Sequence, residues 1–324
     1  MKKAFVLSFM ILCISVISLA ENVYVVGWAS DGISTEKSLW KNGTLHDLSW
    51  LGGGNLCGFD IDNGFYYFAT YTKTATRYND YYDIEISIYR DNEKLYNFKV
   101  EEIKSPYLTN LVVVNGNAYI VINYFHFKGR SDYYDYKIYK NGVFQNEHFS
   151  PGDHSYTCEM LEKSNGYVFI AKTKEYYYSY DNRKSYWGYE GPNRHALVEL
   201  PSYNSELYRL RVFNNDVYLM GSIGNTAYIC QNNEKPQKIS GYKKCTDFAI
   251  VNYSRYWIVD NILINSQGST ILTDVYGMQV YGNNLYVWGM YNHSYCYWII
   301  YPNGTIERVD LPSCVGINNL NITD

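Results

Sequence analysis

The chain has 324 residues and a formal net charge of −4 at pH 7. This charge excludes the strongly basic surface that nucleic acids or anionic membranes would require. Hydrophobic residues make up 47% of the chain, enough for a large core, and 38 residues are tyrosine. Tyrosine favours half-buried strands, because its ring is apolar and its hydroxyl is polar.

The N-terminus has the pattern of a secretory signal peptide. Lys2 and Lys3 precede an apolar run over residues 4–19, and Ser18 and Ala20 form a small-residue cleavage site. We therefore predict a signal peptide over residues 1–20 and an exported protein that is secreted, periplasmic or held at the cell surface. The apolar run is short for a membrane span and no second run follows, so no transmembrane segment is expected.

The remainder, residues 21–324, contains a repeated phrase: an apolar run, a tight turn with Asn or Gly, and a Tyr-rich apolar run. Clear copies lie at Leu111–Val121, Leu210–Gly221 and Met278–Gly289. Asn-Gly or Asn-Asn between runs of alternating apolar residues predicts a β-hairpin. We name its two strands A and B.

A second hairpin phrase follows most copies and supplies strands C and D. It occurs at Leu39–Leu45, Ile88–Leu95, Ile138–Phe144 and Ile300–Ile306. Two hairpins in series form a four-stranded meander. Because no Pro-, Gly- or Ser-rich linker separates the copies, we expect a single domain.

The B strands recur at a spacing typical of propeller blades. They centre near Tyr24, Tyr66, Tyr119, Val168, Tyr218, Trp257 and Tyr286. This spacing predicts an all-β fold, a β-propeller of about seven four-stranded blades, with six or eight blades left open. Residues 22–27 already read as a B strand, whereas residues 315–323 read as a spare A strand. We expect this C-terminal strand to close the ring by completing the first blade, which removes exposed sheet edges.

Two of these phrases carry a resemblance to a known group of proteins. Val23–Gly27 and Leu39–Thr44 resemble the Val-Tyr-Val-Ala-Gly and Tyr-Trp-Lys-Asn-Gly repeats of uncharacterised secreted bacterial β-propeller proteins. The resemblance is sharp in the first and last units, and units two to four depart from it by insertion. It implies a propeller fold and an exported location, and it supplies no catalytic residues.

The inserted B–C connections of units two to four are the candidate binding surface, because repeat folds place function in elaborated loops. They cover residues 71–82, 124–134 and 176–189 and combine tyrosines with aspartates. Tyrosine and tryptophan rings can stack on sugars or on peptide side chains. The alternative is that these tyrosines only pack against each other across long hairpins. The predicted ligand-binding residues are Tyr78, Asp80, Tyr81, Tyr82, Asp132, Tyr133, Tyr134, Tyr177, Tyr180, Asp181 and Trp187.

Four carboxylates on or beside A strands are candidates for catalysis. They are Asp60, Asp62, Glu159 and Asp247. A strands line the centre of a propeller, and glycosidases use a pair of carboxylates that flank the scissile bond. The sequence does not give the separation of these groups, so they remain candidates.

Other residue patterns assign no cofactor or metal. The six histidines lack metal-ligand spacing, and no nucleophile elbow, phosphate loop or dinucleotide fingerprint occurs. Six cysteines follow the predicted signal peptide. We read Cys230 and Cys296 as buried strand residues, and predict a Cys57–Cys314 disulfide across the ring closure.

These observations favour an exported, non-catalytic binding scaffold whose partner is a glycan or a surface protein. One alternative is a propeller glycoside hydrolase or lyase that uses carboxylates at the centre of the ring. A second alternative is a structural component of a cell-surface assembly, which would need an extended apolar patch.

Overall fold

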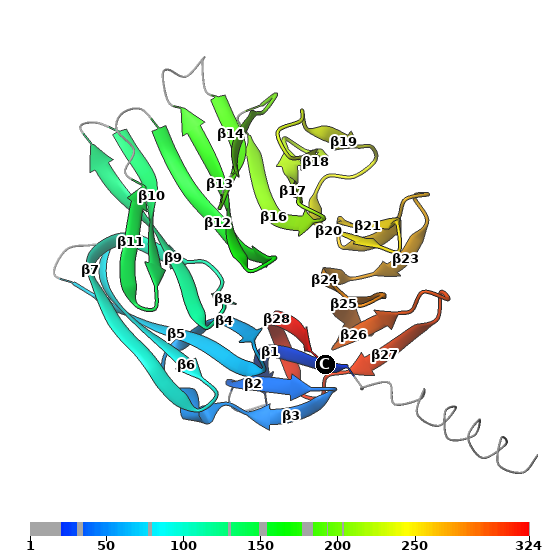
Figure 1. Ribbon diagram of the computed structural model, residues 1–324, viewed down its shortest axis with the longest axis horizontal. Helices are drawn as coiled ribbons and strands as arrows, with labels where there is room; N and C mark the ends of the chain where they lie inside the picture. The colour runs from blue at the N-terminus through cyan, green and yellow to red at the C-terminus, as the bar shows by residue number, and fades with distance from the viewer. Residues whose placement is uncertain are drawn as a thin grey trace, which may run out of the picture.

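The computed structural model describes residues 21–30, 35–76, 80–128, 131–148, 154–176, 184–192, 194–202 and 204–323. The predicted signal peptide lies outside these residues. In the described ranges the chain forms 28 strands and one short 3-10 helix, η1 (Ser49–Leu51). The strands make six antiparallel sheets, five of four strands and one of eight (Figure 1).

The eight-stranded sheet consists of two successive meanders, β4–β7 and β8–β11, which are joined because β7 pairs with β9. The described chain therefore has seven units of four strands, which follow one another around a ring (Figure 1). This confirms the predicted propeller, and we call the units blades 1 to 7.

Blade 1 contains β28 (Cys314–Thr323), β1 (Asn22–Ser30), β2 (Thr35–Lys41) and β3 (Thr44–Asp47). Blade 2 contains β4 (Asn55–Asp62), β5 (Phe65–Ala75), β6 (Tyr81–Arg90) and β7 (Glu93–Leu108). Blade 3 contains β8 (Val112–Val114), β9 (Asn117–Lys128), β10 (Ser131–Lys140) and β11 (Val143–His148). Blade 4 contains β12 (His154–Ser164), β13 (Tyr167–Tyr176), β14 (Lys184–Gly191) and β15 (Arg194–Glu199).

Blade 5 contains β16 (Ser205–Phe213), β17 (Asp216–Ile223), β18 (Ala227–Gln231) and β19 (Gln237–Ile239). Blade 6 contains β20 (Cys245–Val251), β21 (Ser254–Val259), β22 (Ile262–Asn265) and β23 (Thr270–Thr273). Blade 7 contains β24 (Val275–Tyr281), β25 (Asn284–Tyr291), β26 (Ser294–Ile300) and β27 (Ile306–Asp310). The first strand of each blade lies toward the centre of the ring (Figure 1).

The ring is closed by β28, as predicted. This C-terminal strand pairs with β1 from Asn22↔Thr323 to Ala29↔Cys314, and so completes blade 1. Its inner residue Leu320 is fully buried opposite Val25. Closure therefore depends on backbone hydrogen bonds and apolar packing between the two ends of the chain.

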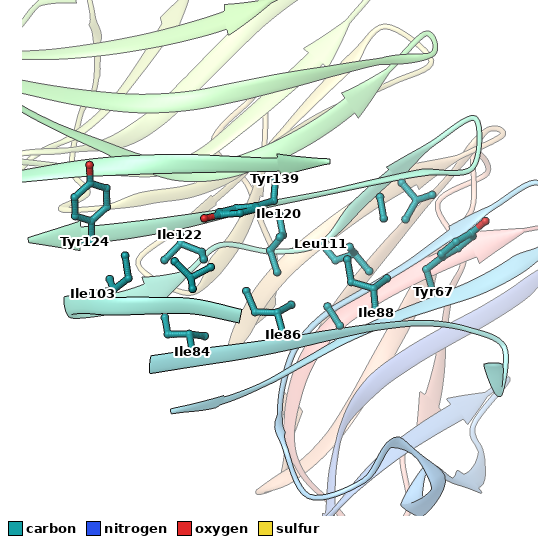
Figure 2. Close-up of a cluster of buried hydrophobic side chains, with 14 residues drawn as sticks. Tyr67, Ile84, Ile86, Ile88, Ile103, Leu111, Ile120, Ile122, Tyr124 and Tyr139 are labelled. Atoms are coloured by element: carbon teal, nitrogen blue, oxygen red, sulfur yellow. The ribbon is translucent and has the colours of Figure 1, made fainter. Parts of the chain in front are cut away.

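The core lies between neighbouring sheets. The largest cluster joins blades 2 and 3, where alternate residues of β6 (Ile84, Ile86 and Ile88) face Ile120 and Ile122 of β9 (Figure 2). In a strand every second side chain lies on the same face, so a run of alternate isoleucines forms one apolar surface. The seven blades stay together because each sheet buries such a surface against the next.

Most inner strands contain a β-bulge, which the sequence did not predict. The A–B pairing of blades 1, 2, 4, 5, 6 and 7 contains a β-bulge with an extra inner-strand residue, and blade 1 has two. The extra residues are Val315, Asn318, Cys57, Glu159, Tyr208, Thr246 and Tyr276. A bulge increases the local twist of the strand and changes the direction of the side chain at the bulge.

The predicted Cys57–Cys314 disulfide is wrong. Both cysteines are free, and each thiol donates a hydrogen bond to a carbonyl of its own blade, Cys57 to Ala69 and Cys314 to Gly316. Cys57 occupies the bulge of β4, which fixes its direction independently of the ring closure. Cys230 and Cys296 are buried, as predicted.

Shortening Leu320 should weaken the closure of the ring. We expect Leu320→Ala to lower the free energy of unfolding by roughly 2–5 kcal/mol, because the deletion leaves a cavity in a packed seam. Val315→Ala, in the same strand but 49% exposed, is the matched control and should change it by less than about 0.5 kcal/mol. Urea denaturation followed by tryptophan fluorescence measures both; equal effects would contradict a buried closing strand.

The cysteines should be unreactive in the folded protein. Burial raises the pKa of Cys57, Cys230 and Cys296 to about 12, so roughly one thiol in ten thousand is ionised at pH 8. Titration of residues 21–324 with a thiol reagent should give almost no fast reaction when folded and six thiols in denaturant. Four thiols or fewer in denaturant would indicate a disulfide.

Candidate functional site

The two faces of the ring differ in their connections. The A–B and C–D turns lie on one side, the turn face, and the B–C and D–A connections lie on the other, the loop face. The A–B turns are tight hairpins; Asn63 and Gly64, for example, both have positive φ, as a two-residue type I′ turn requires. The inserted hairpins of blades 2 to 4 therefore belong to the loop face.

A cavity of about 570 Å³ opens on the loop face where blades 3, 4 and 5 meet. Its described wall includes three tyrosines and three glutamates, with serine and threonine hydroxyls between them. These six residues are Tyr107, Tyr134, Tyr208, Glu159, Glu175 and Glu206. We call this feature the tyrosine–glutamate cavity.

Bulges bring two of these side chains into the wall. Glu159 is the extra residue of the β12 bulge, and Tyr208 is the extra residue of the β16 bulge. The two inner strands are neighbours, so equivalent positions of blades 4 and 5 project into one space. The same bulge therefore adds twist to most of the inner strands and, in these two blades, supplies side chains to the wall of a cavity.

Tyr107 reaches the cavity because blade 3 has an irregular inner strand. β8 is only three residues long, and the end of β7 pairs with β9 in its place, through Tyr107↔Asn123 and Leu108↔Ile122. β7 thus serves blade 2 as its outer strand and blade 3 as the upper part of its inner strand. This exchange both joins the two blades into one sheet and places a tyrosine beside Glu159.

Tyr134 is held in position by blades 3 and 4. Its ring packs edge-on against Phe125 at 5.1 Å between centroids, and its backbone N–H donates to Ser155 Oγ at 2.7 Å. Even so, 39% of Tyr134 is exposed. A rigidly supported, partly exposed ring in a cavity wall can stack on a ligand at low entropic cost.

The carboxylates of the cavity have unequal environments. Glu159 accepts a hydrogen bond from Thr173 Oγ1 at 3.0 Å. Burial raises the pKa of Glu159, and the negative charges of Glu175 and Glu206 raise it further, against the opposing effect of Thr173. Glu206 accepts a hydrogen bond from the Tyr208 hydroxyl. The cavity thus offers carboxylate acceptors beside aromatic faces.

A second, smaller cavity of about 170 Å³ lies at the centre of the ring. Along the inner strands, apolar residues such as Phe59 and Leu210 are buried between blades, and their neighbours, such as Asp60, Arg209 and Arg211, line this central cavity. Asp60 belongs to the central cavity, where it forms an ion pair with Lys163 at 2.7 Å.

Asp247 is a fully buried structural carboxylate. It accepts two hydrogen bonds from Arg211, at 2.9 Å each, and one from the backbone N–H of Met278 in the next blade at 3.0 Å. Burial alone would raise the pKa of Asp247, but the Arg211 and Arg209 guanidiniums outweigh it and hold the pKa below the ordinary 3.8. This ion pair joins blade 5 to blade 6, and its Met278 bond reaches blade 7.

Comparison with known proteins identifies the fold. No family model and no curated protein matches the sequence. The structure is similar to that of a candidate 6-phosphogluconolactonase from Bacteroides fragilis, with a TM-score of 0.50 and 12% identity over 95% of this chain and 99% of that one. A candidate 6-phosphogluconolactonase from Bacteroides uniformis gives a TM-score of 0.48 and 11% identity over 94% and 99% of the two chains. The chain is a β-propeller. At these identities the propeller likeness concerns the fold alone.

The predicted catalytic carboxylates do not converge. Glu159 lies in the tyrosine–glutamate cavity, whereas Asp60 and Asp247 are engaged in ion pairs at the centre of the propeller. Asp62 lies at the turn face, where it accepts a hydrogen bond from the Gly116 N–H at 2.7 Å. The three aspartates therefore form hydrogen bonds and ion pairs that hold the blades together. The carboxylates that share a cavity with Glu159 are Glu175 and Glu206, which were not among the predicted residues.

The predicted ligand-binding residues are placed only in part. Tyr134 lines the cavity, and Asp80 is exposed where β6 begins, while Tyr81 and Tyr82 are half-buried in β6 and are not in the cavity wall. The backbones of Asp132 and Tyr133 lie in β10, opposite Phe127 and His126. Tyr78, Tyr177, Tyr180 and Asp181 lie outside the described residues.

Trp187 is wrong as a binding residue. It is fully buried in the apolar cluster between blades 4 and 5, and a Cβ added to Gly221 would lie 2.7 Å from its ring. Alternation along β14 turns this side chain toward the next blade, so no ligand can reach it.

Four cavity residues were missed: Tyr107, Tyr208, Glu175 and Glu206. Aligning the repeat phrases would have placed Tyr208 beside Glu159, since each stands two residues before a buried leucine, Leu210 or Leu161. Tyr107 has no such signal, because it depends on the exchange between β7 and β8. In the described part of the chain, no helix has the length and apolar composition to cross a membrane. No group of three His, Cys, Asp or Glu side chains among the same residues could hold a metal.

Removing the Asp247 charge should destabilise the propeller strongly. We expect Asp247→Asn to lower the free energy of unfolding by about 3 kcal/mol or more at pH 7, because Arg211 and Arg209 lose their buried partner. Asp310→Asn, which removes the exposed partner of Arg308, is the control and should cost less than about 1 kcal/mol.

The same pair of variants has a pH signature. The pKa of Asp247 is lowered, so its stabilising effect is complete above the ordinary pKa of 3.8 and is lost as the pH falls through the lowered value. The stability gap between wild type and Asp247→Asn should therefore narrow below about pH 4. A gap that widened on acidification would contradict this assignment.

Proposed function

We propose that this propeller is an exported, non-catalytic scaffold that binds a carbohydrate in the tyrosine–glutamate cavity. The observation that carries the proposal is the composition of the cavity wall, in which Tyr107, Tyr134 and Tyr208 stand beside three glutamates. Sugars present apolar ring faces and many hydroxyl donors. Tyrosine rings match the first feature and carboxylate and hydroxyl oxygens match the second.

The size and position of the cavity support a small ligand or the end of a longer one. Its volume of about 570 Å³ falls within the roughly 300–1,000 Å³ of small-molecule sites. It opens on the loop face, beside the inserted hairpins of blades 2 to 4. A surface protein would instead use the outer parts of those hairpins, so the hollow and polar wall favour a glycan.

Export is supported by the sequence at the N-terminus. Lys2 and Lys3, the apolar run and the Ser18–Ala20 cleavage site are typical of a secretory signal peptide. The likeness of Val23–Gly27 and Leu39–Thr44 to repeats of secreted bacterial β-propeller proteins supports the same location. We place the protein outside the cytoplasm on these grounds, as part of the proposal.

A glycan array with the mature protein tests the proposal, followed by calorimetry with the best-binding oligosaccharide. Tyr134→Ala should weaken that binding at least tenfold, because the variant loses a supported stacking face (about 1.4 kcal/mol or more). Tyr253→Ala is the matched control, since Tyr253 is fully exposed at the turn between β20 and β21 on the turn face. Absence of any glycan ligand, or equal loss in both variants, would overturn the proposal.

One observation favours a second function, glycoside hydrolysis. Burial raises the pKa of Glu159, as a general acid requires, and Glu175 and Glu206 line the same cavity and supply the second carboxylate. In such a reaction Glu159 would protonate the leaving oxygen and a second glutamate would activate water or attack the sugar.

Incubation of the protein with its array ligands distinguishes the two functions. If it is a hydrolase, wild type will release reducing ends and Glu159→Gln will lower kcat about a hundredfold or more while binding persists. The wild-type rate will fall as the pH rises through the raised pKa of Glu159, because the acid form is then lost. Binding without release of reducing ends would leave the scaffold function standing.

A further inference from the structure

The central cavity contains an arginine, Arg209, whose Nε has no hydrogen-bond partner among the described residues. The cavity is lined by residues of β4, β12, β16, β24, β25 and β28 and of β8 with the segment before it, and it shares no described wall residue with the tyrosine–glutamate cavity. Three cations, Lys163, Arg209 and Arg211, project into it among carboxylates. A cation that already has hydrogen-bonded partners cannot bind a ligand in the cavity, so the partners of each cation decide which ligand the cavity can bind.

Two of the cations have close partners. Lys163 donates to Asp60 Oδ1 at 2.7 Å and to the carbonyl of Ile61 at 2.8 Å. Arg211 donates to both oxygens of Asp247 at 2.9 Å and to Glu162 at 3.3 and 3.4 Å. These contacts use the geometry in which a guanidinium binds carboxylates most strongly.

The carboxylates are also occupied. Asp60 accepts backbone N–H bonds from Ile61 and Val113, at 2.9 and 2.7 Å. Asp247 accepts backbone N–H bonds from Phe248 and Met278, at 2.9 and 3.0 Å. Because these donors and their cations already bind both aspartates, the aspartates have little capacity left for a further cation.

Arg209 is different. Its Nε lies 3.6 Å from Asp247 Oδ2, which is beyond hydrogen-bond distance, and this buried nitrogen has no hydrogen-bond partner among the described residues. Arg211 lies closer to Asp247, at 2.9 Å, and forms the hydrogen bonds with it. Burial lowers the pKa of Arg209, and the charge of Arg211 lowers it further, against the opposing charges of Asp247 and Glu162. A buried donor without a partner calls for an explanation, and a bound water or ion is one that the adjoining cavity can provide.

We propose that Arg209 binds a small oxyanion, of the carboxylate or phosphate class, in the central cavity. The planar guanidinium offers a pair of parallel donors that fits two oxygens of such an ion. Gln279 of β24, two blades farther around the ring, lines the same cavity and can donate its amide to a third oxygen. The cavity volume of about 170 Å³ is ample for a small ion.

The site is reachable from solvent. The Arg209 side chain is 25% exposed and that of Lys163 35%, so the central cavity is open rather than sealed. An ion can therefore enter without unfolding a blade. Its binding would link β16 of blade 5 to β24 of blade 7 and stabilise the inner ring.

Titration of the mature protein with sodium phosphate and, separately, sodium acetate tests the proposal, with sodium chloride holding ionic strength constant. Calorimetry should show one saturable site, and the thermal midpoint should rise with the concentration of the bound ion. Binding of phosphate alone assigns an inorganic or esterified phosphate, and stronger binding of acetate assigns a carboxylate. Saturation by neither ion would overturn the proposal and leave the cavity to water.

Variants locate the site. Arg209→Gln should lower the affinity for the anion at least tenfold. Arg308→Gln, on the outer strand β27, is the control and should leave this affinity unchanged. Arg209→Lys keeps the charge without the planar fork and should bind with intermediate strength. If Arg209→Gln does not fold, as judged by near-ultraviolet circular dichroism, Gln279→Ala provides an independent test and should weaken binding several-fold. Equal affinity in folded Arg209→Gln or in Gln279→Ala would place the ion elsewhere and overturn the proposal.

Discussion

The pairing of β28 with β1 is the contact on which the rest of the ring depends. Each blade buries an apolar face against the next, so an open ring would leave two such faces and two inner edges in water. Hydrogen bonding between the ends of the chain removes that cost. The closure extends beyond blade 1, because Asn319 of β28 donates to the carbonyl of Phe59 in blade 2 at 2.8 Å. No disulfide joins the described cysteines, so the seam is held by packing and hydrogen bonds.

Polar side chains form similar hydrogen bonds between neighbouring blades around the centre of the ring. Asn123 of blade 3 donates to and accepts from the backbone of Cys158 in blade 4, at 2.9 and 2.8 Å. Asn110 does the same with Leu161, at 2.8 and 2.9 Å. These amides satisfy inner-strand groups that have no sheet neighbour on that side. Buried Asp60 and Asp247 belong to the same class, which explains why carboxylates at the centre of this propeller are structural.

The inner-strand bulge connects this architecture to function. It recurs in six blades, where it adds to the twist of the inner strand, and its extra residue differs from blade to blade. Only the identity of that residue decides whether a blade contributes chemistry. In blades 4 and 5 the residues are Glu159 and Tyr208, and the irregular blade 3 adds Tyr107 beside them. The bulge is repeated around the ring, but it contributes to this cavity only in blades 4 and 5, where its side chains are Glu159 and Tyr208.

The sequence by itself determined the strand order, the tight Asn-Gly turns and the swap of ends, because hairpin signals and apolar alternation are local properties. It also marked Glu159 and Tyr134 as candidates. Tertiary structure decided which candidates meet. Trp187 and Tyr134 look alike as aromatic residues near long hairpins, yet the register of β14 turns one into the core and that of β10 leaves the other exposed. The bulges and the β7–β9 exchange shift such registers by one or two residues, and each shift of one residue reverses the face on which a side chain lies. Residues far apart in the chain, such as Tyr107 and Glu206, share a cavity only because the closed ring brings their strands together.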